Sequence, residues 1–153
     1  FNKGIKIFRE VKDRNGELGL RYNFALILAN TGNYYDAIKQ INELLKITKD
    51  INRYAYSIAL LGYVYLHMGD YQKSIQSFEE ALKSFDLKYK DFEGRYYLAK
   101  AFYALALAKY GKIDEAKLII EDVDRKIGQL KLRPETEELI KNTIEEAKVY
   151  IHG

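Results

Sequence analysis

The sequence has no cysteine and no tryptophan, and its 153 residues include one proline and two histidines. Without cysteine the chain can form no disulfide, no zinc–thiolate site and no cysteine nucleophile, which fits a reducing, cytoplasmic environment. The histidines, His67 and His152, lack the close spacing of a metal-binding pair. No run of about 18 apolar residues occurs, so we expect no membrane-spanning helix.

An excess of charge of one sign is also lacking, since 25 Lys and Arg residues nearly balance 22 Asp and Glu residues. This balance gives no electrostatic reason to expect nucleic acid or an anionic membrane as a partner. The glycines are single instead of forming a phosphate-binding loop. Acidic pairs such as Glu79–Glu80 lie among lysines, as on a solvated helix face. We therefore expect a protein that is not an enzyme and that holds no cofactor or metal.

A repeated segment is the main positive feature of the sequence. The stretches GNYYDA, GDYQKS and GKIDEA begin at Gly32, Gly69 and Gly111, which lie 37 and 42 residues apart. Each reads glycine, polar, large apolar, two further residues and a small residue. Glycine is suited to a helix end that needs a left-handed backbone, because it has no Cβ to clash. The pattern predicts three helix–turn–helix units.

Apolar ladders at helical spacing flank each predicted turn. The ladders after the turns are Ala37, Ile41 and Leu44; Ser74, Phe78 and Ala81; and Ala116, Ile120 and Val123. Those before the turns are Phe24, Ala25 and Leu28; Leu61, Gly62 and Tyr65; and Tyr103, Ala104 and Leu107. Small residues such as Gly62 would let paired helices approach closely, and a larger residue there would overpack the crossing by about 1–3 kcal/mol.

The middle unit carries a family resemblance. Its residues Leu61, Gly62, Tyr65, Gly69, Tyr71, Phe78 and Ala81 resemble the tetratricopeptide repeat, a helical hairpin of about 34 residues. The unit departs from the pattern at Ser74, where Ala is usual, at Ile58 for the early Trp and at Asp86 for the late Pro. The resemblance implies an all-α fold, an α-α superhelix (TPR-like solenoid) of about eight helices in stacked antiparallel hairpins.

We expect residues 1–153 to form a single TPR-like repeat domain. The predicted helices are about 2–13, 17–31, 34–48, 52–68, 71–86, 92–110, 113–129 and 135–151. They make a partial repeat over 1–13, repeats over about 17–48, 52–86 and 92–129, and a capping helix or further half-repeat over 134–151. Gly4, Phe8 and Val11 reproduce a second-helix ladder, so the chain is expected to be a fragment that begins inside a repeat. The last helix should bury the stripe Leu139, Ile144, Ala147 and Ile151, with Val149.

Tyrosine is abundant, with 14 residues, and some tyrosines lie outside the packing ladders. Tyr22, Tyr56 and Tyr63 fall on the other face of the first helices, which lines the concave groove in the family that the sequence resembles. The same helical phase adds Asn23, Leu26, Asn30, Ala59, Leu60, His67, Ala101, Phe102, Leu105 and Lys109. Such an apolar, aromatic groove with a few amides at its edge suits an amphipathic helix or an extended apolar peptide.

The resemblance implies a non-catalytic scaffold that binds a protein or peptide partner. In co-chaperone members of the family, cations and amides clamp a peptide carboxylate. The corresponding positions here are Tyr22, Leu26, Leu60, Leu98 and Phe102, which argues against binding of Hsp70 or Hsp90 C-terminal tails.

Two alternative functions remain open from the sequence. One is a ligand-sensing regulatory domain, since the Lys-rich and Tyr-rich repeats are similar to those of bacterial peptide-pheromone receptors; Asn23 and Asn30 would then hold the peptide backbone. The other is a self-association module that gives a homo-oligomer. The groove could also be filled by another helix of the parent chain or by a second copy.

Overall fold

The computed structural model describes residues 14–152, and the regular elements in that range are helices. The all-α prediction is confirmed, and each helix boundary lies within three residues of its predicted position. The predicted helix 2–13 lies outside the described residues. The elements are α2 (Arg14–Asn30), α3 (Tyr34–Ile47), α4 (Ile51–Met68), α5 (Tyr71–Ser84), the 3-10 helix η1 (Lys90–Phe92), α6 (Glu93–Tyr110), α7 (Ile113–Ile127) and α8 (Pro134–His152).

Tight glycine turns join the two helices of each hairpin, as the repeated segment predicts. Gly32, Gly69 and Gly111 have φ angles of 82°, 82° and 96°, in the left-handed region. At the α4–α5 turn the Gly69 amide donates to the Leu66 carbonyl at 3.1 Å. The Asp70 carboxylate then accepts the Lys73 amide at 3.2 Å and caps α5. One turn therefore ends α4 and starts α5, which fixes the antiparallel hairpin.

Close helix crossing at Gly62 is confirmed. Gly62 is buried in α4, and a Cβ added there would lie 3.0 Å from the ring of Phe78 on α5. The Ser74 hydroxyl, where the family usually has Ala, donates to the Gly62 carbonyl oxygen at 2.7 Å. The missing side chain at Gly62 thus makes room for one ring, while Ser74 adds a buried hydrogen bond across the same crossing.

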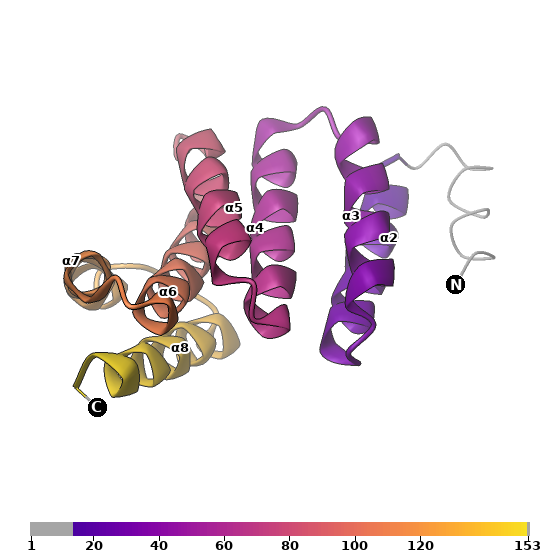
Figure 1. The fold of residues 1–153 in the computed structure, drawn as a ribbon. Helices are drawn as coiled ribbons and strands as arrows, with labels where there is room; N and C mark the ends of the chain where they lie inside the picture. The colour runs from indigo at the N-terminus through magenta and orange to yellow at the C-terminus, as the bar shows by residue number, and fades with distance from the viewer. Residues whose placement is uncertain (1–13, 153) are drawn as a thin grey trace.

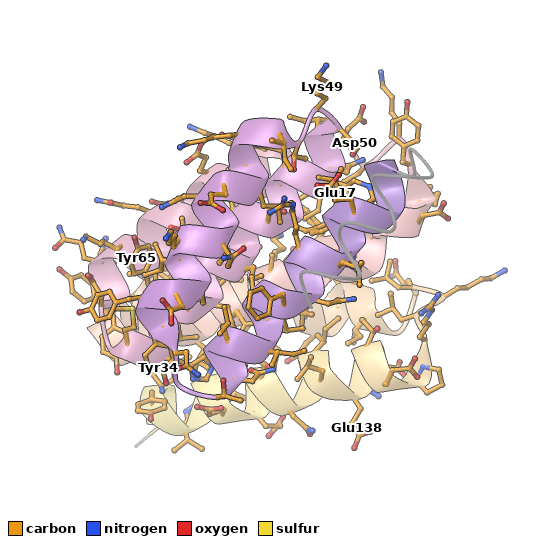
Figure 2. All side chains as sticks on the ribbon, turned by 90° about the vertical axis from the view of Figure 1, so that its right-hand side faces the viewer. Glu17, Tyr34, Lys49, Asp50, Tyr65 and Glu138 are labelled. Carbon is orange, nitrogen blue, oxygen red and sulfur yellow. The ribbon has the colours of Figure 1, made fainter. Side chains whose placement is uncertain are left out.

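The hairpins stack into a curved array. The first helices α2, α4, α6 and α8 contact one another in order, whereas α3, α5 and α7 make their main contacts with the first helices. The first helices therefore form the inner layer and the second helices the outer layer. Figure 1 shows the hairpins α2–α3 and α4–α5 side by side, with α6, α7 and α8 turned away from them. In Figure 2, Lys49 and Asp50 mark the α3–α4 connection, and Tyr34 lies near the opposite end of α3.

Two hydrophobic clusters hold the described array together. One joins α2, α3 and α4 through residues that include Ala25, Ile41 and Val64. The other joins α4 to α8 and includes Phe78 and Leu107. Because α4 contributes to both clusters, it links the first hairpin to the rest of the described array, as expected for stacked repeats in which each unit contacts its neighbours.

The apolar stripe of α8 differs in part from the prediction. Ile144 and Ala147 are buried and Ile151 packs against the core, as expected. The prediction that Leu139 and Val149 are buried is wrong, because their side chains are 45% and 66% exposed. Ile140 and Thr143 are buried in their place. The positions 140, 144, 147 and 151 follow helical spacing of four, three and four residues, and this face is the one that packs on α6.

Candidate functional site

The predicted groove residues lie on α2, α4 and α6, and we call the surface that they form the inner face. The structure gathers several of them into two side-chain clusters. The Tyr63 cluster consists of Asn30, Tyr63, His67 and Phe102. The arginine–tyrosine cluster consists of Tyr22, Arg53, Tyr56, Phe92 and Arg95.

Tyr63 connects three helices within the Tyr63 cluster. Its hydroxyl donates to Asn30 Oδ1 on α2 at 2.7 Å. Its ring lies edge-on to His67, one turn later on α4, and to Phe102 on α6, with centroid distances of 4.3 and 5.1 Å. Tyr63 and Phe102 are half-buried, while Asn30 and His67 are exposed. The cluster thus offers aromatic surface edged by an amide and an imidazole.

Burial sets the protonation of the Tyr63 cluster. Desolvation raises the pKa of Tyr63, and Tyr34 adds to the effect. The pKa of His67 is lowered, first by desolvation and then by the positive charge of Lys109, while Glu146 opposes the shift. Tyr63 and His67 are therefore neutral at pH 7, and the aromatic part of the inner face carries no charge of its own.

Lys109 follows the Tyr63 cluster along the inner face. Its ammonium lies 3.6 Å from Glu146 and 5.3 Å from the ring centroid of Tyr150, both on α8. Asn30, His67 and Lys109 occupy equivalent repeat positions, because they are spaced by the same 37 and 42 residues as the turn glycines. A polar side chain thus recurs at the same place near the ends of α2, α4 and α6.

The arginine–tyrosine cluster lies near the start of α4 and α6, towards the other end of these helices. The Arg95 guanidinium carbon is 4.0 Å from the ring centroid of Tyr56 and 5.3 Å from that of Tyr22. The two tyrosine rings meet edge-on at 5.0 Å, and Phe92 stacks on Tyr56 at 6.2 Å. Arg53 Nη1 donates to the Tyr56 hydroxyl at 3.4 Å. Two cations from two helices therefore meet at one tyrosine side chain.

Tyr22 is neutral as well. Burial raises its pKa, and the positive charge of Arg95 opposes this shift. The hydroxyl stays protonated at pH 7, so the arginine–tyrosine cluster combines neutral phenols with permanently charged guanidinium groups.

The remaining predicted residues differ in exposure. Tyr56, Leu60 and Leu105 are 8%, 4% and 3% exposed, so they support the inner face from beneath. Leu26 is half-buried against the core and Asn23 is exposed on α2.

Arg53, Arg95 and Phe92 were not among the residues expected to form the groove. A signal for the arginines is present in the sequence, since they are 42 residues apart, the spacing of Gly69 and Gly111. They therefore hold equivalent positions at the start of α4 and α6, and equivalent positions of stacked repeats share one side of the array. Phe92 lies in η1, outside the repeat pattern, and carried no such signal.

Residues 14–152 contain neither a candidate metal-binding cluster nor a membrane-spanning helix. No three His, Asp or Glu side chains in this range gather in a way that could hold a metal ion. None of the described helices combines the length and the apolar character needed to cross a bilayer.

Comparison with known proteins gives a family match for part of the chain. Residues 17–87 match a family model described as tetratricopeptide repeat, and this segment contains the α2–α3 and α4–α5 hairpins. Neither the curated proteins nor the solved structures gave a match.

Proposed function

We propose that the protein is a non-catalytic scaffold whose inner face binds a protein or peptide partner, on the premise that residues 17–87 match the tetratricopeptide repeat family. Repeats of this kind are in general protein-interaction scaffolds, and the curvature of stacked helical hairpins creates an extended binding surface.

The observation that carries the proposal is the Tyr63–Phe102 pair. The ring centroids of Tyr63 on α4 and Phe102 on α6 are 5.1 Å apart. Both side chains are half-buried, so part of each ring is open to solvent. Rigid aromatic side chains with a polar tip are favoured at protein interfaces, because they present large contact area with few rotatable bonds. His67 and Asn30 beside them supply hydrogen-bonding groups.

The proposed occupant is an amphipathic helix or an extended peptide with apolar side chains. Apolar side chains would contact Tyr63 and Phe102, while the peptide backbone or polar side chains would reach Asn30, His67 and Lys109. The proposal does not extend to the acidic C-terminal tails of chaperones, since Tyr22, Leu26 and Phe102 stand where a carboxylate clamp would need cations or amides.

Selection from a random peptide library tests the proposal. Phage-displayed dodecapeptides would be selected on the wild-type protein, and the recovered peptides measured against His67→Ala and Phe102→Ala by fluorescence anisotropy. We expect each variant to weaken binding about fivefold or more, because aromatic anchors dominate interface energies. Tyr35→Ala is the matched control, because this tyrosine is 80% exposed on α3 of the outer layer.

Circular dichroism separates binding from folding in this experiment. The proposal requires that His67→Ala and Phe102→Ala keep the wild-type helix content. Failure of the library to yield any binding peptide, or equal affinity of all variants, would contradict it.

Self-association is a second candidate function, favoured by the exposed apolar side chains of α8. Leu139 and Val149 are 45% and 66% exposed on the last helix, and a second copy of the chain that covered these apolar side chains would remove them from water. Light scattering at increasing concentration should then show a dimer that Val149→Lys returns to a monomer. A wild-type monomer at every concentration would exclude this function.

A further inference from the structure

Arg53 and Arg95 differ from the other described cations of the inner layer in having no carboxylate partner. Within the described part of the chain, Arg21 pairs with Glu17 at 3.2 Å, Lys109 with Glu146 at 3.6 Å and Lys100 with Asp122. No acidic group of residues 14–152 lies within 4.0 Å of the Arg53 or Arg95 guanidinium. Helix α4 has no acidic residue in its sequence.

The acidic groups close in sequence to these arginines are engaged elsewhere. The Asp50 carboxylate accepts the Arg53 backbone amide at 2.9 Å, which caps α4. Glu93, the one acidic residue of α6, pairs with Lys90 at 3.2 Å. Both guanidinium groups therefore keep donors that a ligand carboxylate could use.

Stacking on tyrosine prepares Arg95 for such a ligand. A guanidinium that lies over an aromatic ring uses its face for the ring and leaves the N–H groups at its edge free to bind a carboxylate in bidentate fashion. Arg95 is exposed, although Tyr56 beneath it is 8% exposed. Because the ring already restricts the side chain, less conformational entropy is lost when a ligand binds.

We propose that Arg53 and Arg95, ordered by Tyr56 and Tyr22, form a subsite for the acidic side chains of a peptide that docks along the inner face. This inference rests on the proposed function and adds the partner's chemistry to it. The peptide places Asp or Glu side chains at the arginine–tyrosine cluster and apolar side chains at the Tyr63 cluster.

The peptides selected from the random library provide the test. In the selected sequences, Asp and Glu should be enriched over the unselected library, next to apolar residues. A synthetic selected peptide should lose about fivefold or more in affinity when its Glu residues are replaced by Gln, as expected for exposed charge pairs. Raising the salt concentration should weaken binding of the Glu peptide and leave binding of the Gln peptide nearly unchanged.

Protein variants locate the effect. Arg53→Gln/Arg95→Gln should remove the preference for the Glu peptide while keeping the affinity for the Gln peptide. The control Arg125→Gln/Arg133→Gln removes the same charge from exposed positions in α7 and in the segment before α8, and it should retain the preference. The single variant Arg95→Lys should retain only part of the preference for the Glu peptide, because an ammonium cannot bind a carboxylate in bidentate fashion.

The outcomes separate this inference from the proposed function. If selected peptides bind at the Tyr63 cluster but Glu and Gln forms bind equally well, the acidic subsite is wrong and the scaffold function stands. If the charge-matched control loses the preference as fully as Arg53→Gln/Arg95→Gln, the attraction is non-specific and the subsite is also wrong. If no peptide is selected at all, both proposals fail.

Discussion

At the scale of single residues, Gly62 shows how one missing side chain sets the spacing of two helices. Its absent Cβ leaves room for Phe78, which is 1% exposed and held 3.0 Å from that position. The sequence alone predicts this feature, because a glycine inside an apolar helix disfavours the helix by about 1 kcal/mol and needs a packing reason.

Gly62→Ala should therefore destabilise the protein by about 1 kcal/mol, because overpacking against Phe78 outweighs the gain in helix propensity. Urea denaturation measures this change. Gly19→Ala is the matched control, since a Cβ at Gly19 in α2 meets nothing within 4 Å, and it should stabilise by about 0.5–1 kcal/mol. Equal stabilisation by both substitutions would contradict the account of the crossing.

Tyr103 gives a residue-scale prediction about pH. Burial raises the pKa of Tyr103, and Glu79 adds to the shift by its charge and as acceptor of the phenol hydrogen bond at 3.1 Å. The folded state therefore holds this proton more tightly than the unfolded state, whose tyrosine pKa is about 10. The resulting stabilisation is complete below about pH 10 and is lost as the pH rises towards the folded-state pKa.

The free energy of unfolding of the wild type should accordingly fall above about pH 10. The free energy of unfolding of Tyr103→Phe should fall less steeply over the same range. Urea titrations between pH 8 and pH 11 compare the two proteins. Parallel curves would show that Tyr103 does not contribute. Tyr150→Phe, at a tyrosine whose side chain is 46% exposed, is the control and should follow the wild type.

At the scale of helices, the boundaries follow from local sequence, whereas the buried face of a helix also depends on its partner. Helix α8 contains apolar residues on more than one side, and α6 selects the side of Ile140 and Ile144. Periodicity alone could not exclude Leu139 and Val149 from the buried stripe of α8, because neither their spacing nor their residue types reveal where α6 lies.

Asn52 joins the start of α4 to the chain after α5. Its amide donates to the Asp86 carbonyl at 3.2 Å and accepts the Asp86 amide at 2.7 Å, and its side chain is 1% exposed. Asn52→Ala should lower stability by about 2 kcal/mol, because two backbone groups lose their partner. Thermal unfolding tests this against Asn42→Ala, at an exposed position of α3, and similar small losses in both would show that the amide does not close the hairpin.

At the scale of the whole molecule, the repeat order could be predicted from the glycine spacing, but the meeting of distant side chains could not. Arg95 reaches Tyr22 across α4 because α6 turns relative to the first hairpin, and this turn leaves no mark in the local sequence. Leu105 and Phe102, both predicted for the groove, likewise differ in burial, since Leu105 is buried and Phe102 half-buried.

Nearest-neighbour packing predicts that a substitution at one end of the array destabilises mainly the helices at that end. Ile144→Ala removes a buried side chain of α8, 2% exposed, and should destabilise by about 2–4 kcal/mol. Hydrogen exchange should accelerate in α6, α7 and α8 and remain near wild type in α2 and α3, which α8 does not contact through its main packing face. Uniform acceleration along the chain would show a single cooperative unit instead.

The central claim is that the inner face of α2, α4 and α6 binds a peptide, and nuclear magnetic resonance mapping tests it most directly. A library-selected peptide would be titrated into the ¹⁵N-labelled protein. We expect the largest amide shift changes at Tyr63, His67 and Phe102, with little change at Tyr35 and Leu118 of the outer helices. Shift changes concentrated on α3, α5 and α7, with the inner face unaffected, would contradict the claim.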